Sequence, residues 1–556
     1  MFVVSKFSNA PVKAPAPAKG PLKTKKSGKS VLTRESGAGF VKTEKTALFC
    51  LAVTNMVKEP TYYESADKRD SRMVDLVRKV AVADPEWIAA FVPYLRNVAN
   101  MRSASIVIAA EAAKALLDAR PKGVQVTPIS IPDLIDSAIV RGDEPAEMLG
   151  YWMSVYGRKV PMGVKRGVAR AATRIFNERN AIKYDTNSQS IRYGDVIELT
   201  HPAPKAAWQS GLFDHLLTRR HGVKETSFEG LPILEAANHL ALIPEGERRA
   251  AIEVYGPEML NDAGFTWERL SSWIPGGMDA AAWEAIIPSM GYMALLRNLR
   301  NFEQAKVSKS VLKTVRDKLE DPEQVTKSRQ FPYRFYSAWK NSGSTYFASA
   351  IETALELSTA NIPEFSGRTG VLIDTSGSMA APVSGRSDIA MWEIGALFAA
   401  SVAARSGDCV LGIYGDTWDT VPVDVSVLRT VDRVSKLNGS VGHGTQTWPS
   451  ALGMIKEHGP FDRLLVFTDM QDHPPTGSFR AHTGRSSWGR ASGKNGASGH
   501  LPEDLSVFAW DLSGQPTSNI NTNTPGRYLL SGFSDNAFKL VGLLEDSVDA
   551  TWPWET

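Results

Sequence analysis

The feature that most constrains the fold is a short apolar run that ends in an acid. Residues 371–373 (Val-Leu-Ile) lead into Asp374, and two hydroxyl side chains, Ser376 and Ser378, follow at alternate positions. An apolar run of this kind predicts a strand that is buried in a parallel sheet. The loop after it gathers hard oxygen donors, which are the ligands that Mg²⁺ prefers. One carboxylate and two hydroxyls are too few to hold the ion, so the loop predicts further ligands downstream.

Two residues further along the chain meet this need. Thr445 lies in a glycine-rich segment, and Asp469 ends a second apolar run at residues 464–468 (Leu-Leu-Val-Phe-Thr). This order of oxygen donors resembles the metal-ion-dependent adhesion site of von Willebrand factor A domains. The resemblance implies Mg²⁺ held by Asp374, Ser376, Ser378, Thr445 and Asp469. The alternative is that Asp374 and Ser376 only cap the turn that follows them.

The pattern on either side of this site predicts a chain of several parts, because 556 residues exceed one hydrophobic core. Strands alternate with helices over 366–556, which predicts a doubly wound α/β domain. Within it, residues 471–503 form a long basic loop that either contacts RNA or is disordered in the free protein. Residues 35–365 are typical of an α-solenoid of helical repeats. Residues 1–34, rich in lysine and proline, predict a flexible basic arm.

Composition says more about the cellular compartment of the protein than about its activity. A net charge of +3 does not by itself indicate nucleic acid as a partner. The two cysteines, Cys50 and Cys409, lie far apart without metal-binding spacing, which predicts reduced thiols in a cytoplasmic protein. We find no apolar run long enough to span a membrane, and residues 1–4 are too short an apolar stretch for a signal peptide. We therefore expect a cytoplasmic protein without a membrane partner.

The main basic segment spans residues 158–179. Arg166, Arg170 and Arg174 fall four residues apart and therefore stack along one side of a helix whose other side is apolar. Glu178 is the one acid in this range. Like charges repel unless an anion offsets them, and arginine binds phosphate through paired hydrogen bonds. The segment predicts a face that binds an RNA backbone; the alternative is a solvated basic face.

Several stretches of the helical part resemble the TROVE module of the Ro autoantigen family. They are residues 59–63 (Glu-Pro-Thr-Tyr-Tyr), 198–204 (Glu-Leu-Thr-His-Pro-Ala-Pro) and 293–299 (Met-Ala-Leu-Leu-Arg-Asn-Leu). They stand in the family's order and are followed by a metal-site domain. The resemblance implies a ring of HEAT-like helical repeats that the von Willebrand-type domain closes. Members of the family bind small non-coding RNAs, called Y RNAs, on the outer surface, and single-stranded ends of misfolded RNAs in the central hole.

The same resemblance implies which residues hold RNA. The family's basic RNA-binding helix falls on residues 158–179, and a following loop and helix start at 190–195 line the RNA path. Where the family has a histidine, this chain has Tyr193, which is either a base-stacking residue or a buried structural one. The expected RNA-binding residues are Lys165, Arg166, Arg170, Arg174, Arg192 and Tyr193.

Together these features predict a monomeric RNA-binding scaffold in RNA quality control, with no catalytic residues. Its partners would be small non-coding RNA, single-stranded RNA ends and an exoribonuclease, to which bacterial family members can tether RNA. Two alternatives stay open. The metal site could recruit a partner protein through a carboxylate, with RNA incidental. It could instead activate water for hydrolysis, which needs a positioned base that the sequence does not identify.

Overall fold

The computed structural model describes residues 20–26, 31–54, 57–119, 127–222, 228–359, 362–385, 387–474, 479–481, 484–486, 500–546 and 551–555. These residues divide into two compact units. The helical unit runs from Asp70 to Ala360. The sheet unit combines the described residues up to Arg69 with those that follow Asn361.

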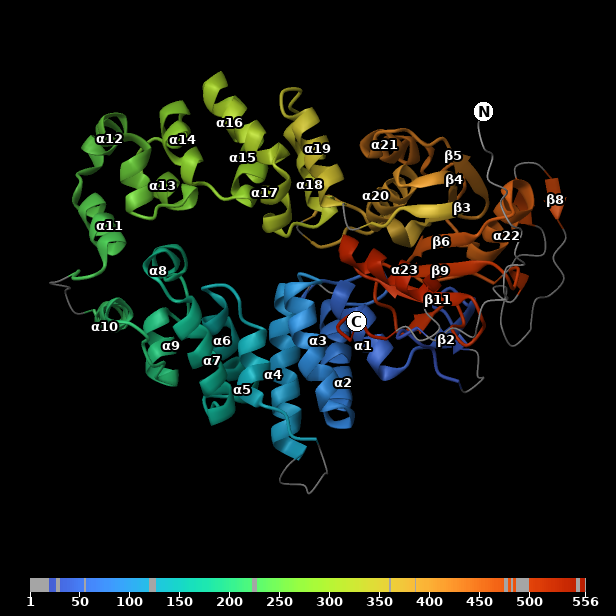
Figure 1. The fold of residues 1–556 in the computed structure, drawn as a ribbon, viewed down its shortest axis with the longest axis horizontal. Coiled ribbons are helices and arrows are strands. Elements are labelled where there is room, and N and C mark those ends of the chain that lie inside the picture. Colours follow the sequence, from blue (N-terminus) through green and yellow to red (C-terminus); the bar gives the residue numbers. More distant parts are fainter. Residues whose placement is uncertain are drawn as a thin grey trace, which may run out of the picture. The chain divides into compact units, whose positions relative to one another are not determined.

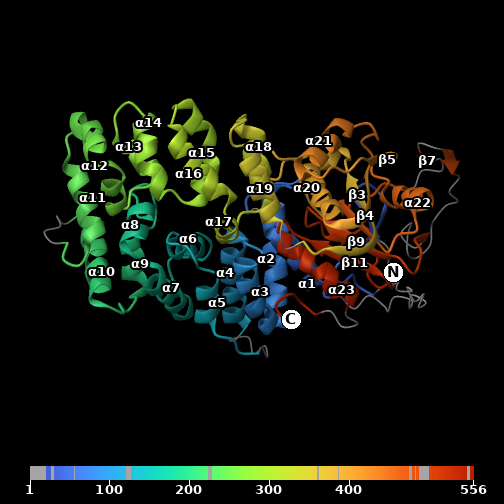
Figure 2. The same ribbon diagram turned by 45° about the horizontal axis from the view of Figure 1, so that its top comes forward.

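The described part of the helical unit consists of α-helices, short 3₁₀ turns and connecting loops. Neighbouring helices pack on one another, as α3 does on α4 and α18 on α19 (Figure 2). None of the helices that the structure describes is long and apolar enough to cross a membrane. The helices are α2 (Ala66–Ala83), α3 (Pro85–Asn97), α4 (Arg102–Ala119), α5 (Ile131–Ser137), α6 (Glu144–Tyr156), α7 (Met162–Ile175), α8 (Glu178–Tyr184), α9 (Tyr193–Thr200), α10 (Ala207–Arg220), α11 (Pro232–Leu242), α12 (Arg248–Asp262), α13 (Trp267–Trp273), α14 (Ala280–Ile286), α15 (Tyr292–Gln304), α16 (Lys309–Glu320), α17 (Pro322–Ser328), α18 (Pro332–Ser342) and α19 (Ala348–Ser358).

Local chemistry sets the ends of several of these helices. Asp84 caps α3 by accepting a hydrogen bond from the backbone N–H of Trp87 at 3.1 Å. Ser130 caps α5 in the same way, through the backbone N–H of Asp133. Both caps supply an acceptor for an amide that has no partner within its helix. Gly157 ends α6 with a φ of 80°, a conformation that favours glycine.

A six-stranded sheet forms the core of the sheet unit (Figure 1). The strands follow the order β11-β9-β6-β3-β4-β5, and all neighbours are parallel except the antiparallel pair β4 and β5. They are β3 (Phe365–Asp374), β4 (Ser406–Tyr414), β5 (Trp418–Val421), β6 (Arg463–Thr468), β9 (Ser506–Asp511) and β11 (Arg527–Ser531). The helices of this unit are α1 (Glu44–Thr54), α20 (Met391–Ala404), α21 (Val427–Leu437), α22 (Thr447–His458) and α23 (Lys539–Asp546).

Helices cover both faces of this sheet, as a doubly wound fold requires. Successive strand residues point to opposite faces. Ile373 and Phe467 face α20, where a Cβ added to Gly395 would lie 3.4 Å and 3.3 Å from their side chains. Gly412, in register with the residue before Ile373, faces the other way, where an added Cβ would lie 3.9 Å from the sulfur of Met454 on α22.

The described residues before Asp70 build onto the sheet unit. β1 (Val31–Leu32) pairs with β2 (Ala38–Val41), and β2 pairs in turn with β10 (Thr517–Ser518). Lys42 is fully buried after β2, and its ammonium lies 2.5 Å from an oxygen of Asp511. A buried ion pair of this kind holds because each charge removes the cost of burying the other.

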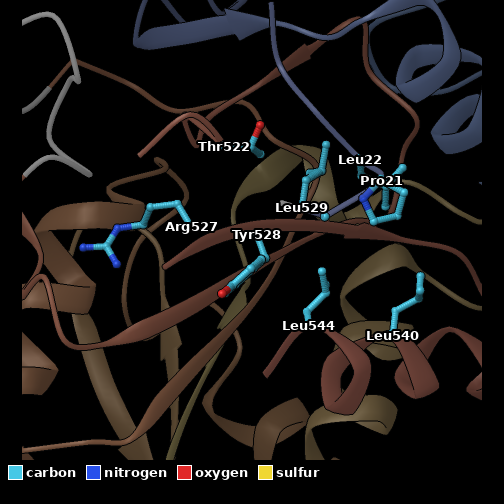
Figure 3. A pocket seen from close by; sticks show the side chains of 9 residues that line it. Pro21, Leu22, Thr522, Arg527, Tyr528, Leu529, Leu540 and Leu544 are labelled. Atoms are coloured by element: carbon cyan, nitrogen blue, oxygen red, sulfur yellow. The ribbon is translucent and has the colours of Figure 1, made fainter. Parts of the chain in front are cut away.

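This placement differs from the predicted domain boundaries. We expected a flexible arm over 1–34 and the helical domain from 35, but residues 31–69 belong to the sheet unit. Within the predicted arm, Leu22 is buried and lines a small hollow with Leu529 and Leu540 (Figure 3). The sequence did not predict these apolar contacts, because the charge and proline content of residues 1–34 indicated a flexible segment. Residues 1–19 and 27–30 lie outside the described residues.

The predicted loop over 471–503 is described only in part. Residues 479–481 and 484–486 form the antiparallel strands β7 (Phe479–Ala481) and β8 (Gly484–Ser486). Residues 475–478, 482–483 and 487–499 lie outside the described residues, so the suggested RNA contact of this loop stays a prediction.

Candidate functional site

The first candidate site lies at the carboxyl edge of the sheet. Asp374 is the last residue of β3, and Asp469 directly follows β6, the neighbouring strand. Both side chains are buried. The hydroxyl of Thr468 donates to Oδ2 of Asp374 at 2.8 Å, and the hydroxyl oxygens of Ser376 and Ser378 lie 3.3 Å apart. The strand-ending acids and the two serines therefore meet at one edge, as predicted.

Thr445 reaches this edge through the loop before α22. The backbone N–H of Gly377, between the two serines, donates to the carbonyl oxygen of His443 at 2.9 Å. Thr445 follows two residues later and is buried. The loop can approach β4 because Gly415 has no side chain: a Cβ there would lie 2.3 Å from the carbonyl oxygen of Gly442. The structure thus joins the loops that carry all five predicted ligands.

The electrostatics of this edge fit a divalent cation. Burial raises the pKa of Asp374, and burial together with the charge of Asp374 raises the pKa of Asp469 well above its usual value. Neither carboxylate forms an ion pair with a side chain that the structure describes. Two buried acids with hydroxyl oxygens beside them match the donor preference of Mg²⁺. Because a cation would relieve both burial and repulsion, the five residues suit the predicted ion.

The second candidate site lies on α7, where two of the three arginines of the predicted stripe are paired with acids. Gly167 allows α7 to pack closely on α5, since a Cβ there would lie 2.6 Å from Ile135. Arg170 then pairs with Asp133, and Arg174 pairs with Asp136 at 2.5 Å. Both arginines remain partly exposed. The stripe therefore carries less net charge than the sequence of α7 alone suggests.

The remaining cations lie at the start of α7. Arg166 is exposed and Lys165 is half-buried, while the exposed Arg158 and Lys159 directly precede the helix. None of the four forms an ion pair with another residue within the described ranges. We call these four residues the α7 basic patch. Their charge adds to the positive end of the helix dipole, which favours an anion.

Arg192 and Tyr193 prove to be parts of the fold, which corrects their predicted place on the RNA surface. Arg192 pairs with the buried Asp185 at 3.1 Å. The side chain of Tyr193 is enclosed: the residue is 1% exposed, and its ring stacks on Phe176 with the centroids 3.8 Å apart. A ring covered in this way cannot stack on a base. The structural alternative therefore holds for Tyr193.

An exposed aromatic residue near α7 was not predicted from the sequence. Trp208, at the start of α10, is 44% exposed. The next residue, Gln209, donates from its side-chain amide to the carbonyl oxygen of Thr173 on α7 at 2.8 Å. A lysine three positions before the tryptophan, Lys205, is the signal that could have marked this aromatic residue beside basic charge.

The comparisons with known proteins bear on the helical unit and on the whole fold. Residues 253–354, from α12 to α19, match the model of the TROVE domain family. This part of the chain is therefore similar to a TROVE domain. Helices α7 to α9 precede the matched range. Among curated proteins no match to the chain is found.

The fold of the chain is similar to that of a solved structure, the Ro (RSR) protein of Deinococcus radiodurans. The two align with a TM-score of 0.58 over 90% of this chain and 99% of that one. The predicted fold class, helical repeats followed by a doubly wound sheet domain of von Willebrand A type, is confirmed. At 16% identity this likeness shows the fold alone.

Proposed function

We propose that this protein is an RNA-binding scaffold of a ribonucleoprotein. The observation that carries the proposal is the α7 basic patch, whose four cations have no counter-charge among the described residues. A phosphate backbone supplies such counter-charges at regular spacing, and lysine and arginine hold it whatever the base sequence. The TROVE-domain match and the fold shared with a Ro protein support this choice of ligand.

Small non-coding RNA of the Y type and single-stranded ends of misfolded RNA are the ligands we propose, with a role in RNA quality control. An exoribonuclease is the proposed protein partner. We further propose that the chain is a cytoplasmic monomer without catalytic activity of its own. Mg²⁺ would bind Asp374, Ser376, Ser378, Thr445 and Asp469. A bound ion would balance the charge of the two acids.

Binding of a labelled hairpin RNA with a single-stranded 3′ tail tests the proposal, measured by fluorescence anisotropy on the full chain. The double variant Lys165→Ala/Arg166→Ala should bind about tenfold more weakly at moderate salt, because two phosphate contacts are lost. The matched control is Lys309→Ala/Lys456→Ala, which also removes two exposed cations that form no ion pair within the described residues. Equal affinity of both variants would contradict the assignment of RNA to α7.

The same reaction mixtures distinguish the scaffold from a nuclease. We expect the RNA to keep its full length during incubation with Mg²⁺. Shortening that EDTA stops, and that Asp374→Ala abolishes, would show hydrolysis at the metal site and would contradict the absence of an enzyme activity.

A further inference from the structure

The tip of the β1–β2 hairpin lies against the loop that follows β6. The backbone N–H of Gly37 and the hydroxyl of Thr33 both donate to the carbonyl oxygen of Asp472, at 2.9 and 2.6 Å. The backbone N–H of Arg34 donates to the side chain of Gln471 at 2.8 Å. A Cβ at Gly37 would lie 2.2 Å from the oxygen of Asp472, so this approach requires glycine. The hairpin is therefore seated on the loop that carries a candidate metal ligand.

Glu35, at this tip, contacts two side chains, His473 and Tyr63, that lie beside candidate ligands. Its Oε2 lies 2.9 Å from Nε2 of His473, and Nδ1 of His473 accepts the backbone N–H of Thr445 at 3.0 Å. Its Oε1 accepts the hydroxyl of Tyr63 at 2.9 Å. Tyr63 and Ser378 line the same small cavity. Since Nδ1 of His473 is an acceptor, Nε2 carries the proton and donates it to Glu35.

The same segment closes the space beside the candidate ligands. Ser378 and Asp469 line a cavity of about 20 Å³. Pro60, Tyr62 and Tyr63 form part of its other walls. A space of this size holds about one water molecule, and it is too small for a side chain of another protein.

We propose that Glu35 completes the metal site from within the chain. It supplies a third negative charge near the ion, acting as a positioning residue through Tyr63 and His473. The hairpin tip then takes the place of a partner's acidic side chain, and a bound ion fastens residues 33–37 to the sheet. This inference rests on the proposed Mg²⁺ site, and it gives the site a use within the fold instead of in recruitment.

Titration of the full chain with Mn²⁺, followed by electron paramagnetic resonance, tests this inference. Glu35→Gln keeps the shape of the side chain and removes its charge, so it should weaken Mn²⁺ binding by about tenfold, the effect typical of groups behind the direct ligands. Glu44→Gln is the matched control, because Glu44 is an exposed acid of the same segment that pairs with Lys25. This control should bind Mn²⁺ as the unchanged chain does.

Asp374→Ala separates failure of the inference from failure of the site. If Asp374→Ala abolishes binding while Glu35→Gln leaves it unchanged, the metal site stands and the role of Glu35 is overturned. If Asp374→Ala also binds normally, the metal site itself is absent, and the inference falls with it.

Hydrogen exchange gives a second measure that does not depend on affinity. Saturating Mn²⁺ should slow exchange of the Gly37 amide, which donates to Asp472, in the unchanged chain. The slowing should be smaller in Glu35→Gln at equal occupancy. Equal protection in both proteins would contradict the link between the ion and the hairpin.

Discussion

The two units treat buried acids in opposite ways. In the helical unit, burial would raise the pKa of Glu144, but the backbone amides of Val140 and Arg141 and the charges of Arg96 and Arg102 outweigh it and leave the pKa lowered. At the edge of the sheet, burial raises the pKa of Asp374, and burial together with the charge of Asp374 raises the pKa of Asp469. Arginines and backbone amides balance the charge of Glu144, whereas no side chain that the structure describes forms an ion pair with Asp374 or Asp469.

The difference indicates where the protein needs a ligand. Arg96 and Arg102 lie 2.7 and 3.1 Å from Glu144, so this part of the helical unit is complete without an ion. The same reasoning applies to the positive charges of α7. Arg170 and Arg174 have acids beside them, while the α7 basic patch has none among the described residues. Charge that the fold leaves without a counter-charge marks the candidate cation site and the candidate RNA site.

The largest expected effect is the loss of stability when Glu144 is removed. Glu144→Ala should lower the free energy of unfolding by about 3–5 kcal/mol, because it leaves Arg96 buried without its partner. Urea denaturation followed by circular dichroism measures the loss. Glu323→Ala, which removes one member of an exposed pair with Lys327, should change stability by less than about 0.5 kcal/mol.

The pH dependence of stability at the same position has a defined sign. Since the pKa of Glu144 is lower in the folded than in the unfolded chain, its contribution is present above the unfolded pKa and is lost as pH falls through the folded pKa. Glu144→Gln should therefore show a shallower loss of stability on acidification than the unchanged chain. A parallel loss in both proteins would mean that Glu144 is not neutralised as described.

The next effect is the stabilisation of the folded chain by a cation bound at Asp374 and Asp469. Mg²⁺ at a hundred times its dissociation constant should stabilise the folded chain by about 2.7 kcal/mol, because it binds the folded state only. Thermal unfolding with added Mg²⁺ and with EDTA measures the shift. In Asp374→Ala the two melting temperatures should coincide, and a shift that persists would place the ion elsewhere.

The smallest effect concerns the arginines that are already paired. Arg170→Ala/Arg174→Ala should weaken binding of the hairpin RNA about two- to threefold, less than loss of the unpaired cations, because a phosphate must compete with Asp133 and Asp136. Anisotropy measurements at one salt concentration provide the comparison. A larger loss than in Lys165→Ala/Arg166→Ala would reverse the proposed order.

The sequence predicts well which oxygen donors meet at the sheet edge, because the geometry of that edge is local. A strand-ending acid followed by two hydroxyls is positioned by a few backbone angles, and parallel strands bring Asp374 and Asp469 to the same edge. The partners of α7 could not be predicted in this way. Asp133 lies 37 residues before Arg170, and only the packing of α5 on α7 brings them together.

The N-terminal residues show the same limit. Lysines and prolines suggested an arm without structure, but the buried Leu22 and Lys42 depend on partners near the end of the chain. The sequence did not place Glu35 near the candidate metal ligands either, because its partner His473 is 438 residues away. Long-range contacts of this kind leave no local pattern in the sequence.

The salt dependence of RNA affinity tests the central claim most directly. For the unchanged chain, the logarithm of the binding constant should fall linearly with the logarithm of the salt concentration. For Lys165→Ala/Arg166→Ala the slope should be shallower by about 1.4 to 1.8, the contribution of two phosphate contacts. An unchanged slope in this variant would show that the RNA phosphates are held elsewhere and would contradict the account.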